Sequence, residues 1–231
     1  MGQEQRDFDI GRRRLLRAFA YSAFIGSAIQ SGVQLATAEG APTDLSPDAA
    51  LKKLLDGNQR AAAGKLTSLE RDLAILREHT VNNQEPFAAV LSCADSRVPV
   101  EMIFDQTIGD IFVTRVAGNV VTPEIIASLE FGVAVLGVET LLVLGHSSCG
   151  AVKAAMKAEE VPGQISTLYP HLRQAVQQAG GSLDKAIEAN AMIQAELLRT
   201  SSTVIRAAVQ AGKLKVESGV YDLASGKVTL S

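Results

Sequence analysis

The sequence lacks several features that mark large functional classes. It has no excess of basic residues, because 25 acidic residues outnumber 22 lysines and arginines and give a formal net charge of −3. This balance argues against a nucleic acid or an anionic membrane surface as partner. No internal repeat stands out, and no G-x-G-x-x-G segment follows a predicted strand, so a nicotinamide-binding site has little support. Cysteine is scarce, with only Cys93 and Cys149.

Both cysteines lie in short motifs that contain other chemically active residues, CADSR (93–97) and HSSC (146–149). Two thiolates and an imidazole form the ligand set of a catalytic zinc site, which keeps a fourth position open. We therefore predict that Cys93, His146 and Cys149 bind zinc. A disulfide between the two cysteines is the main structural alternative in an exported chain. It leaves His146, Asp95 and Arg97 unexplained.

Short apolar runs place these motifs at one edge of a sheet. The runs at 87–91, 111–113 and 141–144 alternate with helical segments, which is typical of parallel strands buried on both faces. The predicted fold is therefore α/β, with a central, mostly parallel β-sheet flanked by helices. Sites in such sheets form beyond the carboxyl ends of the strands. Cys93 and His146 each follow or end a predicted strand, so we expect them on the same edge.

The remaining segments predict mainly helices. A Ser-Pro-Asp start at 46–48 predicts a helix to about residue 63, and a second is expected at 68–79. The apolar content of a helix at 124–136 implies that it is buried on most sides. His79 is interpreted as a surface residue at a helix end, and His171 as a helix-surface or packing residue. Further elements are expected as helices at 99–104, 165–179, 184–200 and 203–211, and as strands at 213–221 and 227–230.

The motifs together resemble those of the β-class carbonic anhydrases. The resemblance rests on CADSRVP (93–99), FVTRVAGN (112–119), SLEFGVAVLGV (128–138) and GHSSCG (145–150), and extends to GNQR (57–60) and GVYDLASG (219–226). It implies one Zn²⁺ per subunit on the two cysteines and the histidine. It also implies that the leading helices wrap a partner subunit, giving a homodimer or a higher homo-oligomer.

The resemblance assigns roles to further residues. Asp95 and Arg97 form the family's catalytic dyad. A substrate-contacting glutamine lies nine residues before the first cysteine in the family, and Gln84 occupies that position. The other substrate-binding positions implied are Phe112 and Ala117, which match pocket-lining residues, and Gly150, which offers a backbone donor.

Some members of the family close the site at low pH, when the aspartate takes the fourth zinc position. A tryptophan three residues before the first cysteine helps to stabilise that state. This chain has Val90 there and no tryptophan, although Arg115 and Tyr221 match other parts of the same pocket. We expect an open resting site, with Asp95 paired to Arg97, and Asp95 as a metal ligand only in a closed state.

The implied function is reversible hydration of carbon dioxide to bicarbonate and a proton by zinc-bound hydroxide. One alternative is hydrolysis of carbonyl sulfide or carbon disulfide at the same site, because the attacked carbon is chemically analogous. Another is a non-catalytic structural zinc module, in which Asp95 fills the fourth position permanently.

Residues 1–38 are predicted to be an export signal, and 39–231 to be the catalytic domain. Arg12 and Arg13 approximate a twin-arginine pair, and residues 18–38 carry no charge and end in a small-residue cleavage site. We expect a periplasmic protein, or one in an equivalent lumen, without stable membrane association after cleavage. The alternative is an anchor formed by residues 18–38, because 21 uncharged residues can just span a bilayer. Several serines and glutamines make that span poor.

Overall fold

The structure is a computed structural model that describes residues 44–70 and 73–231. The predicted export signal, its cleavage site and the alternative anchor all lie outside the described residues. Within the described ranges, no helix has both the length and the apolar character needed to cross a membrane.

Five strands form one sheet in the order β2-β1-β3-β4-β5. Their bounds are β1 Ala88–Ser92, β2 Ile111–Arg115, β3 Thr140–His146, β4 Lys215–Tyr221 and β5 Val228–Leu230. The first four strands are parallel, and β5 runs antiparallel to β4. The prediction of a mostly parallel α/β fold is confirmed.

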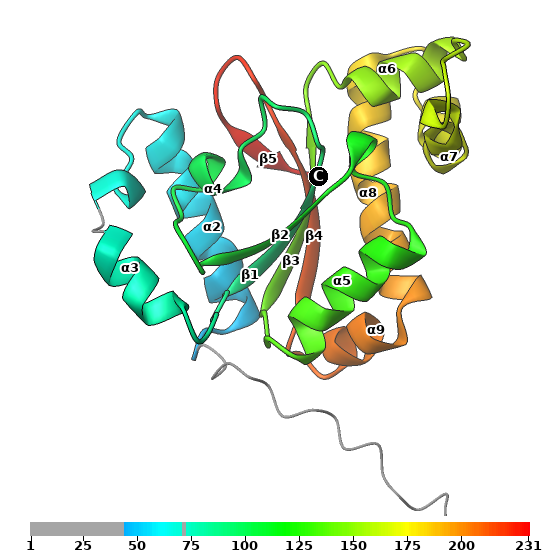
Figure 1. Cartoon of the computed structure of the whole chain (residues 1–231). Coiled ribbons are helices and arrows are strands. Elements are labelled where there is room, and N and C mark those ends of the chain that lie inside the picture. The colour runs from blue at the N-terminus through cyan, green and yellow to red at the C-terminus, as the bar shows by residue number, and fades with distance from the viewer. Residues whose placement is uncertain (1–43, 71–72) are drawn as a thin grey trace, which may run out of the picture. The chain divides into compact units, whose positions relative to one another are not determined.

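Helices cover both faces of this sheet (Figure 1). The α-helices are α2 Pro47–Ala62, α3 Leu73–Thr80, α4 Val100–Ile103, α5 Pro123–Ala134, α6 Gly150–Lys157, α7 Tyr169–Gln178, α8 Leu183–Ser201 and α9 Thr203–Gln210. The described residues also form three short 3₁₀ turns between these elements: η1 Ser68–Glu70, η2 Ala117–Asn119 and η3 Ile165–Leu168. The predicted start of the first helix is confirmed, because the Ser46 side chain accepts a hydrogen bond from the Ala49 N–H just before Pro47.

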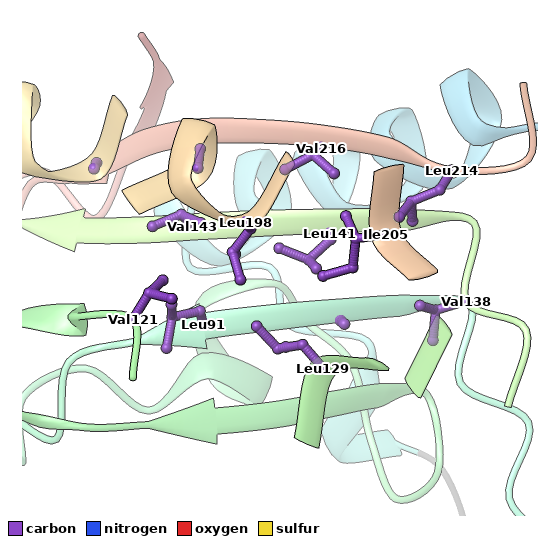
Figure 2. Close-up of a cluster of buried hydrophobic side chains, with 13 residues drawn as sticks. Leu91, Val121, Leu129, Val138, Leu141, Val143, Leu198, Ile205, Leu214 and Val216 are labelled. Carbon is purple, nitrogen blue, oxygen red and sulfur yellow. The ribbon is translucent and has the colours of Figure 1, made fainter. Parts of the chain in front are cut away.

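The two faces of β1 pack into two different cores, which explains its uninterrupted apolar sequence. Leu91 packs with side chains of α5, α8 and α9, among them Leu129, Leu198 and Ile205 (Figure 2). Val90, its neighbour, points to the opposite face and packs with residues of α2 and α4. The buried members of both cores are at most 4% exposed, so the sheet is a well-packed support for the loops that follow its strands.

The predicted helix at 68–79 is wrong in its first turn, because the structure has η1 there and begins α3 at Leu73. The buried carboxylate of Asp105 explains the short turn. It accepts hydrogen bonds from the backbone N–H groups of Thr67 and Ser68 at 2.8 Å and from Arg60 Nε at 2.6 Å. Burial alone would raise the pKa of Asp105, but hydrogen bonds from Ser68, Arg60 and Thr67 hold it well below its usual range.

The prediction that the helix at 124–136 is buried on most sides is also wrong for this single chain. Helix α5 packs on β1, β2 and α9, but only Leu129 and Gly132 are buried within it. Phe131 is 43% exposed. Helix α5 therefore leaves one large aromatic side chain open to water, beside the exposed polar residues Glu124 and Ser128.

Candidate metal centre

Three side chains converge at the carboxyl-terminal edge of the sheet. Cys93 directly follows β1, His146 is the last residue of β3, and Cys149 is the N-cap residue of α6. Their ligand atoms all lie within 4.8 Å of one another, and all three residues are buried. Both cysteines are free thiols in the structure. Thus parallel strands bring together residues that are 53 and 56 positions apart, in the way the strand pattern predicts.

His146 presents a nitrogen lone pair to this cluster. Its Nδ1 lies 3.0 Å from the backbone oxygen of Ser147, and since a carbonyl only accepts hydrogen bonds, Nδ1 carries the proton. Nε2 is then an acceptor, and it is buried with no hydrogen-bond partner among the described residues. An unpaired buried acceptor is destabilising, and a metal ion would satisfy it. Two thiols and this imidazole therefore fit the ligand set of Zn²⁺.

The two thiols affect each other's ionisation. A hydrogen bond from Cys149 outweighs burial and lowers the pKa of Cys93, with smaller contributions from His146 and the backbone N–H of Gly118. The same interaction with Cys93, together with burial, raises the pKa of Cys149. A second thiolate at this distance requires a neighbouring cation, which a divalent metal supplies.

Asp95 and Arg97 form a two-pronged ion pair beside the cluster. Arg97 Nε donates to Asp95 Oδ1 at 2.9 Å, and Arg97 Nη2 donates to Oδ2 at 2.7 Å. These side-chain hydrogen bonds hold the pKa of Asp95 well below its usual range, so its carboxylate is ionised. Asp95 Oδ2 lies 3.8 Å from His146 Nε2, too far for a hydrogen bond but on the same side as the unpaired nitrogen.

Arg115 shapes the loop that carries Cys93 and Asp95. It ends β2, and its guanidinium donates to the backbone oxygens of Cys93 at 3.0 Å and Asp95 at 2.6 Å. The loop is thereby fixed to the end of the neighbouring strand.

The other predicted site residues fall into two groups. Ala117 begins η2 and precedes Gly118, whose N–H donates to Cys93 Sγ. Gly150 directly follows the ligand Cys149. Both are therefore next in sequence to a residue that belongs to or contacts the cluster. Gln84 and Phe112 are not brought to the cluster within one chain. Gln84 precedes the amino end of β1, whereas Cys93 follows its carboxyl end.

The length of the strand separates these positions. From Ala88 to Cys93, a strand rise of about 3.3 Å per residue gives a separation of roughly 16 Å. Phe112 pairs in register with Ala89, also in the amino-terminal half of β1. Its ring centroid lies 6.2 Å from that of Phe131 in α5.

Gln84 instead lines a hollow of about 450 Å³ with residues that include Ile108 and Phe131. Its lining is mixed: Thr80, Asn82, Asn83 and Gln84 are polar. Three large apolar side chains beside them are open to water, since Val81 is 75% exposed and Ile108 and Phe131 are each 43% exposed. We call this region, from Val81 through Gln84, Ile108 and Phe131, the Gln84 surface. Three exposed large apolar side chains close together are a feature of surfaces that another molecule covers.

Two buried amides of α8, Asn190 and Gln194, also bear on the site, and neither was singled out from the sequence. They lie four residues apart on the stripe of α8 that packs into the protein, among Ala186, Ile187, Ala191, Ala195 and Leu198. Polar residues at buried helical positions are the signal that could have identified them.

Comparisons with known proteins agree on one family. The family model described as "Carbonic anhydrase" matches residues 88–228. The carbonic anhydrase of Mycolicibacterium smegmatis is 38% identical over 194 residues, covering 80% of this chain and 93% of that protein. Carbonic anhydrase 2 of Mycobacterium tuberculosis is 33% identical over 193 residues, with the same two coverages of 80% and 93%.

Solved structures show the same similarity in three dimensions. The β-carbonic anhydrase CafA of Aspergillus fumigatus superposes with a TM-score of 0.62 at 28% identity, covering 78% of this chain and 90% of that one. The Coccomyxa β-carbonic anhydrase in complex with acetazolamide gives a TM-score of 0.61 at 27% identity, covering 78% and 85%.

Proposed function

This chain belongs to the β-class carbonic anhydrase family, and on that premise we propose that it catalyses the reversible hydration of carbon dioxide with Zn²⁺ as cofactor. The observation that carries the proposal is the convergence of Cys93, His146 and Cys149 beside the ionised Asp95–Arg97 pair.

The protein's own groups orient the reacting water. When bound, zinc supplies the Lewis acidity that makes a water molecule nucleophilic near neutral pH. Asp95 accepts a hydrogen bond from the attacking water, because its carboxylate is ionised and lies on the side of the cluster where His146 Nε2 is unpaired. Arg97 engages both oxygens of Asp95 and so keeps the carboxylate in that orientation.

The reaction consumes only CO₂ and water, and it needs a buffer base to accept the proton. A water oxygen forms a bond to the carbon of CO₂, one C=O electron pair moves onto oxygen, and the water's proton passes to buffer, giving bicarbonate. The groups proposed to stabilise the developing oxyanion are Gln84 and the backbone N–H groups at Cys149 and Gly150, where α6 begins. Ala117 is proposed to line the pocket.

We further propose that Gln84 and Phe112 reach the site from a second copy of the chain. Both lie toward the amino-terminal edge of the sheet, away from Cys93, as described above. The Gln84 surface exposes three large apolar side chains among polar ones, which suits a contact between two copies. In a two-fold symmetric dimer, each copy would place this surface against the metal centre of the other.

Zinc content and stopped-flow CO₂ hydration, measured on the purified protein and on Asp95→Asn, test the proposal. We expect one zinc per chain in both proteins, and a hydration rate about 10²–10⁴-fold lower in the variant because the group that orients the water is neutralised. Faster turnover of carbonyl sulfide than of CO₂ would favour the alternative substrates. Zinc without any hydration would favour a structural metal site, and a protein without zinc would contradict the proposal.

Export of the protein is a separate proposal that rests on the leader sequence. We expect the exported protein to begin at or near Glu39, and replacement of Arg12 and Arg13 by Lys to leave the precursor inside the cell. N-terminal sequencing checks this. A protein that retains residues 18–38 and fractionates with membranes would show that the leader is an anchor.

A further inference from the structure

The sulfur of Cys93 accepts a hydrogen bond from the backbone N–H of Gly118, with N and Sγ 3.3 Å apart. Gly118 lies inside η2 with φ 75° and ψ 13°, a left-handed conformation that glycine adopts without steric penalty. A Cβ added there would lie 3.3 Å from Ala151 Cβ and 3.5 Å from Leu172. Because glycine restricts its own backbone so little, other groups must hold the N–H on the sulfur.

Helix α8 provides the groups that hold the Gly118 backbone in place, and the first of them lies 72 residues further along the chain. Asn190 Nδ2 donates to the backbone oxygen of Gly118 at 2.8 Å. One turn further on, Gln194 Oε1 accepts a hydrogen bond from the N–H of Val121 at 2.8 Å. Gln194 Nε2 donates to Asn190 Oδ1 at 3.1 Å and to the backbone oxygen of His171 at 3.2 Å. The two amides therefore hold both ends of the 118–121 loop.

The backbone fixes the direction of every hydrogen bond in this network. The Gly118 oxygen can only accept, so it must face the Asn190 amide nitrogen, and the Val121 N–H can only donate, so it must face the Gln194 oxygen. The remaining Asn190 oxygen and Gln194 nitrogen then face each other with the correct polarity. Neither side-chain amide can flip, exchanging its oxygen and nitrogen, without breaking at least one of these hydrogen bonds.

The network is deeply buried in apolar surroundings. Asn190 and Gln194 are each 1% exposed, and their neighbours on the buried stripe of α8 are alanine, isoleucine and leucine. Burying an amide is unfavourable unless its hydrogen bonds are made, whereas aliphatic residues fill such positions without that penalty. The specific contribution of the two amides is therefore the geometry of the loop that reaches Cys93.

We propose that Asn190, oriented by Gln194, is a positioning residue of the metal centre: it fixes the Gly118 N–H on Cys93 Sγ and so sets the donor strength of this thiolate ligand. The inference rests on the proposed zinc site. An N–H···S hydrogen bond withdraws electron density from the sulfur and restrains its position. Without it, the thiolate is more electron-rich and less well held, as when outer-shell partners of other metal ligands are removed.

Replacement of zinc by Co²⁺ allows the thiolates to be observed directly, through the sulfur-to-cobalt charge-transfer absorption. In Asn190→Leu, which keeps the side-chain size but removes the donor, we expect this band to move to lower energy. We also expect the zinc form to release its metal to a chelator about tenfold faster than wild type. Gln194→Met leaves Asn190 in place but removes its orienting bond, so a smaller change in the same directions is expected.

Asn58→Leu is the matched control. Asn58 is also buried, and its Nδ2 donates to the backbone oxygens of Ile103 at 3.1 Å and Gly226 at 2.9 Å. It lies in α2, which packs on the other face of the sheet. Its loss is expected to lower stability to urea while leaving the cobalt band and the rate of zinc release unchanged.

The outcomes separate this inference from the proposed function. Wild-type band positions and release rates in Asn190→Leu overturn the inference, and so do equal changes in Asn58→Leu. If Asn190→Leu does not fold, a folded Gln194→Met with wild-type values overturns it instead. A wild-type protein that gives no sulfur-to-cobalt band contradicts the zinc site itself.

Discussion

The distance between Gln84 and Cys93 makes a subunit-mixing experiment decisive for how the active site is assembled. In the proposed dimer, each site combines the metal ligands and Asp95 of one chain with Gln84 of the other. Two inactive variants can therefore repair each other. We choose Gln84→Ala and Asp95→Asn, because Gln84 is exposed and Asp95→Asn conserves the side-chain shape.

The expected activity follows from counting sites. Alone, Gln84→Ala is expected to hydrate CO₂ about 10²–10³-fold more slowly than wild type, because removal of one oxyanion donor typically has this effect. Asp95→Asn is expected to hydrate CO₂ about 10²–10⁴-fold more slowly than wild type. After dissociation and random reassociation of equal amounts, half of the dimers are mixed, and one of the two sites in each mixed dimer is complete. The mixture should recover about a quarter of the wild-type activity per chain, if the dimer is two-fold symmetric.

Stopped-flow CO₂ hydration before and after reassociation provides the assay. The matched control places Gln84→Ala and Asp95→Asn in one chain and mixes it with an equal amount of wild type. Mixed dimers then contain no complete site, so activity should fall from about half to about a quarter of wild type on reassociation. The first mixture could instead keep the mean activity of its two separate variants, and the control half of the wild-type activity. That result would show that Gln84 does not act across an interface.

Three further predictions concern single residues. Cys149→Ser should lose zinc because a hydroxyl replaces a thiolate ligand, and full zinc occupancy by metal analysis would refute the ligand assignment. Asp105→Asn should lower the free energy of unfolding by about 3 kcal/mol at pH 7, since it leaves Arg60 and the two backbone N–H groups that bind the carboxylate poorly paired. Because folding depresses the pKa of Asp105, its stabilisation is complete above the unfolded value of ~3.9 and is lost as the pH falls further. Urea titrations should therefore show the gap between wild type and variant narrowing from pH 7 to pH 3, and a constant gap would contradict this. Arg97→Ala should release Asp95 to occupy the fourth zinc position, abolishing activity while zinc is retained; an unchanged zinc K-edge spectrum with normal activity would contradict it.

The sheet and the position of the cluster could be predicted because their signals are local. Each apolar run directly precedes its functional residue, so recognising the strand also places Cys93 or His146 at its end. The rule that sites form at the carboxyl ends of parallel strands then brings them together. No long-range information was needed beyond the number and direction of the strands.

The location of Gln84 could not be predicted in this way. It lies only nine residues from Cys93 in the sequence, yet an extended strand converts that short interval into a separation across the sheet. The apolar side of α5 was misjudged for a related reason. Periodicity shows that a helix face is apolar, but it does not show whether the same chain or a second one covers it.

Asn190 was missed because its partner is distant in sequence. Its place on the apolar stripe of α8 could indicate that it is buried, but not which group it binds. Its hydrogen bond to Gly118 spans 72 positions, and only the folded chain shows that the two residues meet.

The proposed division of the site between two chains predicts that metal binding and turnover depend differently on protein concentration. Cys93, His146 and Cys149 all belong to one chain, so a separated subunit keeps its complete ligand set. The proposed contact of Gln84 with substrate exists only in the pair. On dilution below the dissociation constant of the dimer, activity per zinc should therefore fall while zinc content stays constant. In the proposed dimer, the second subunit is an activating ligand, and its concentration sets the fraction of metal-loaded protein that is active.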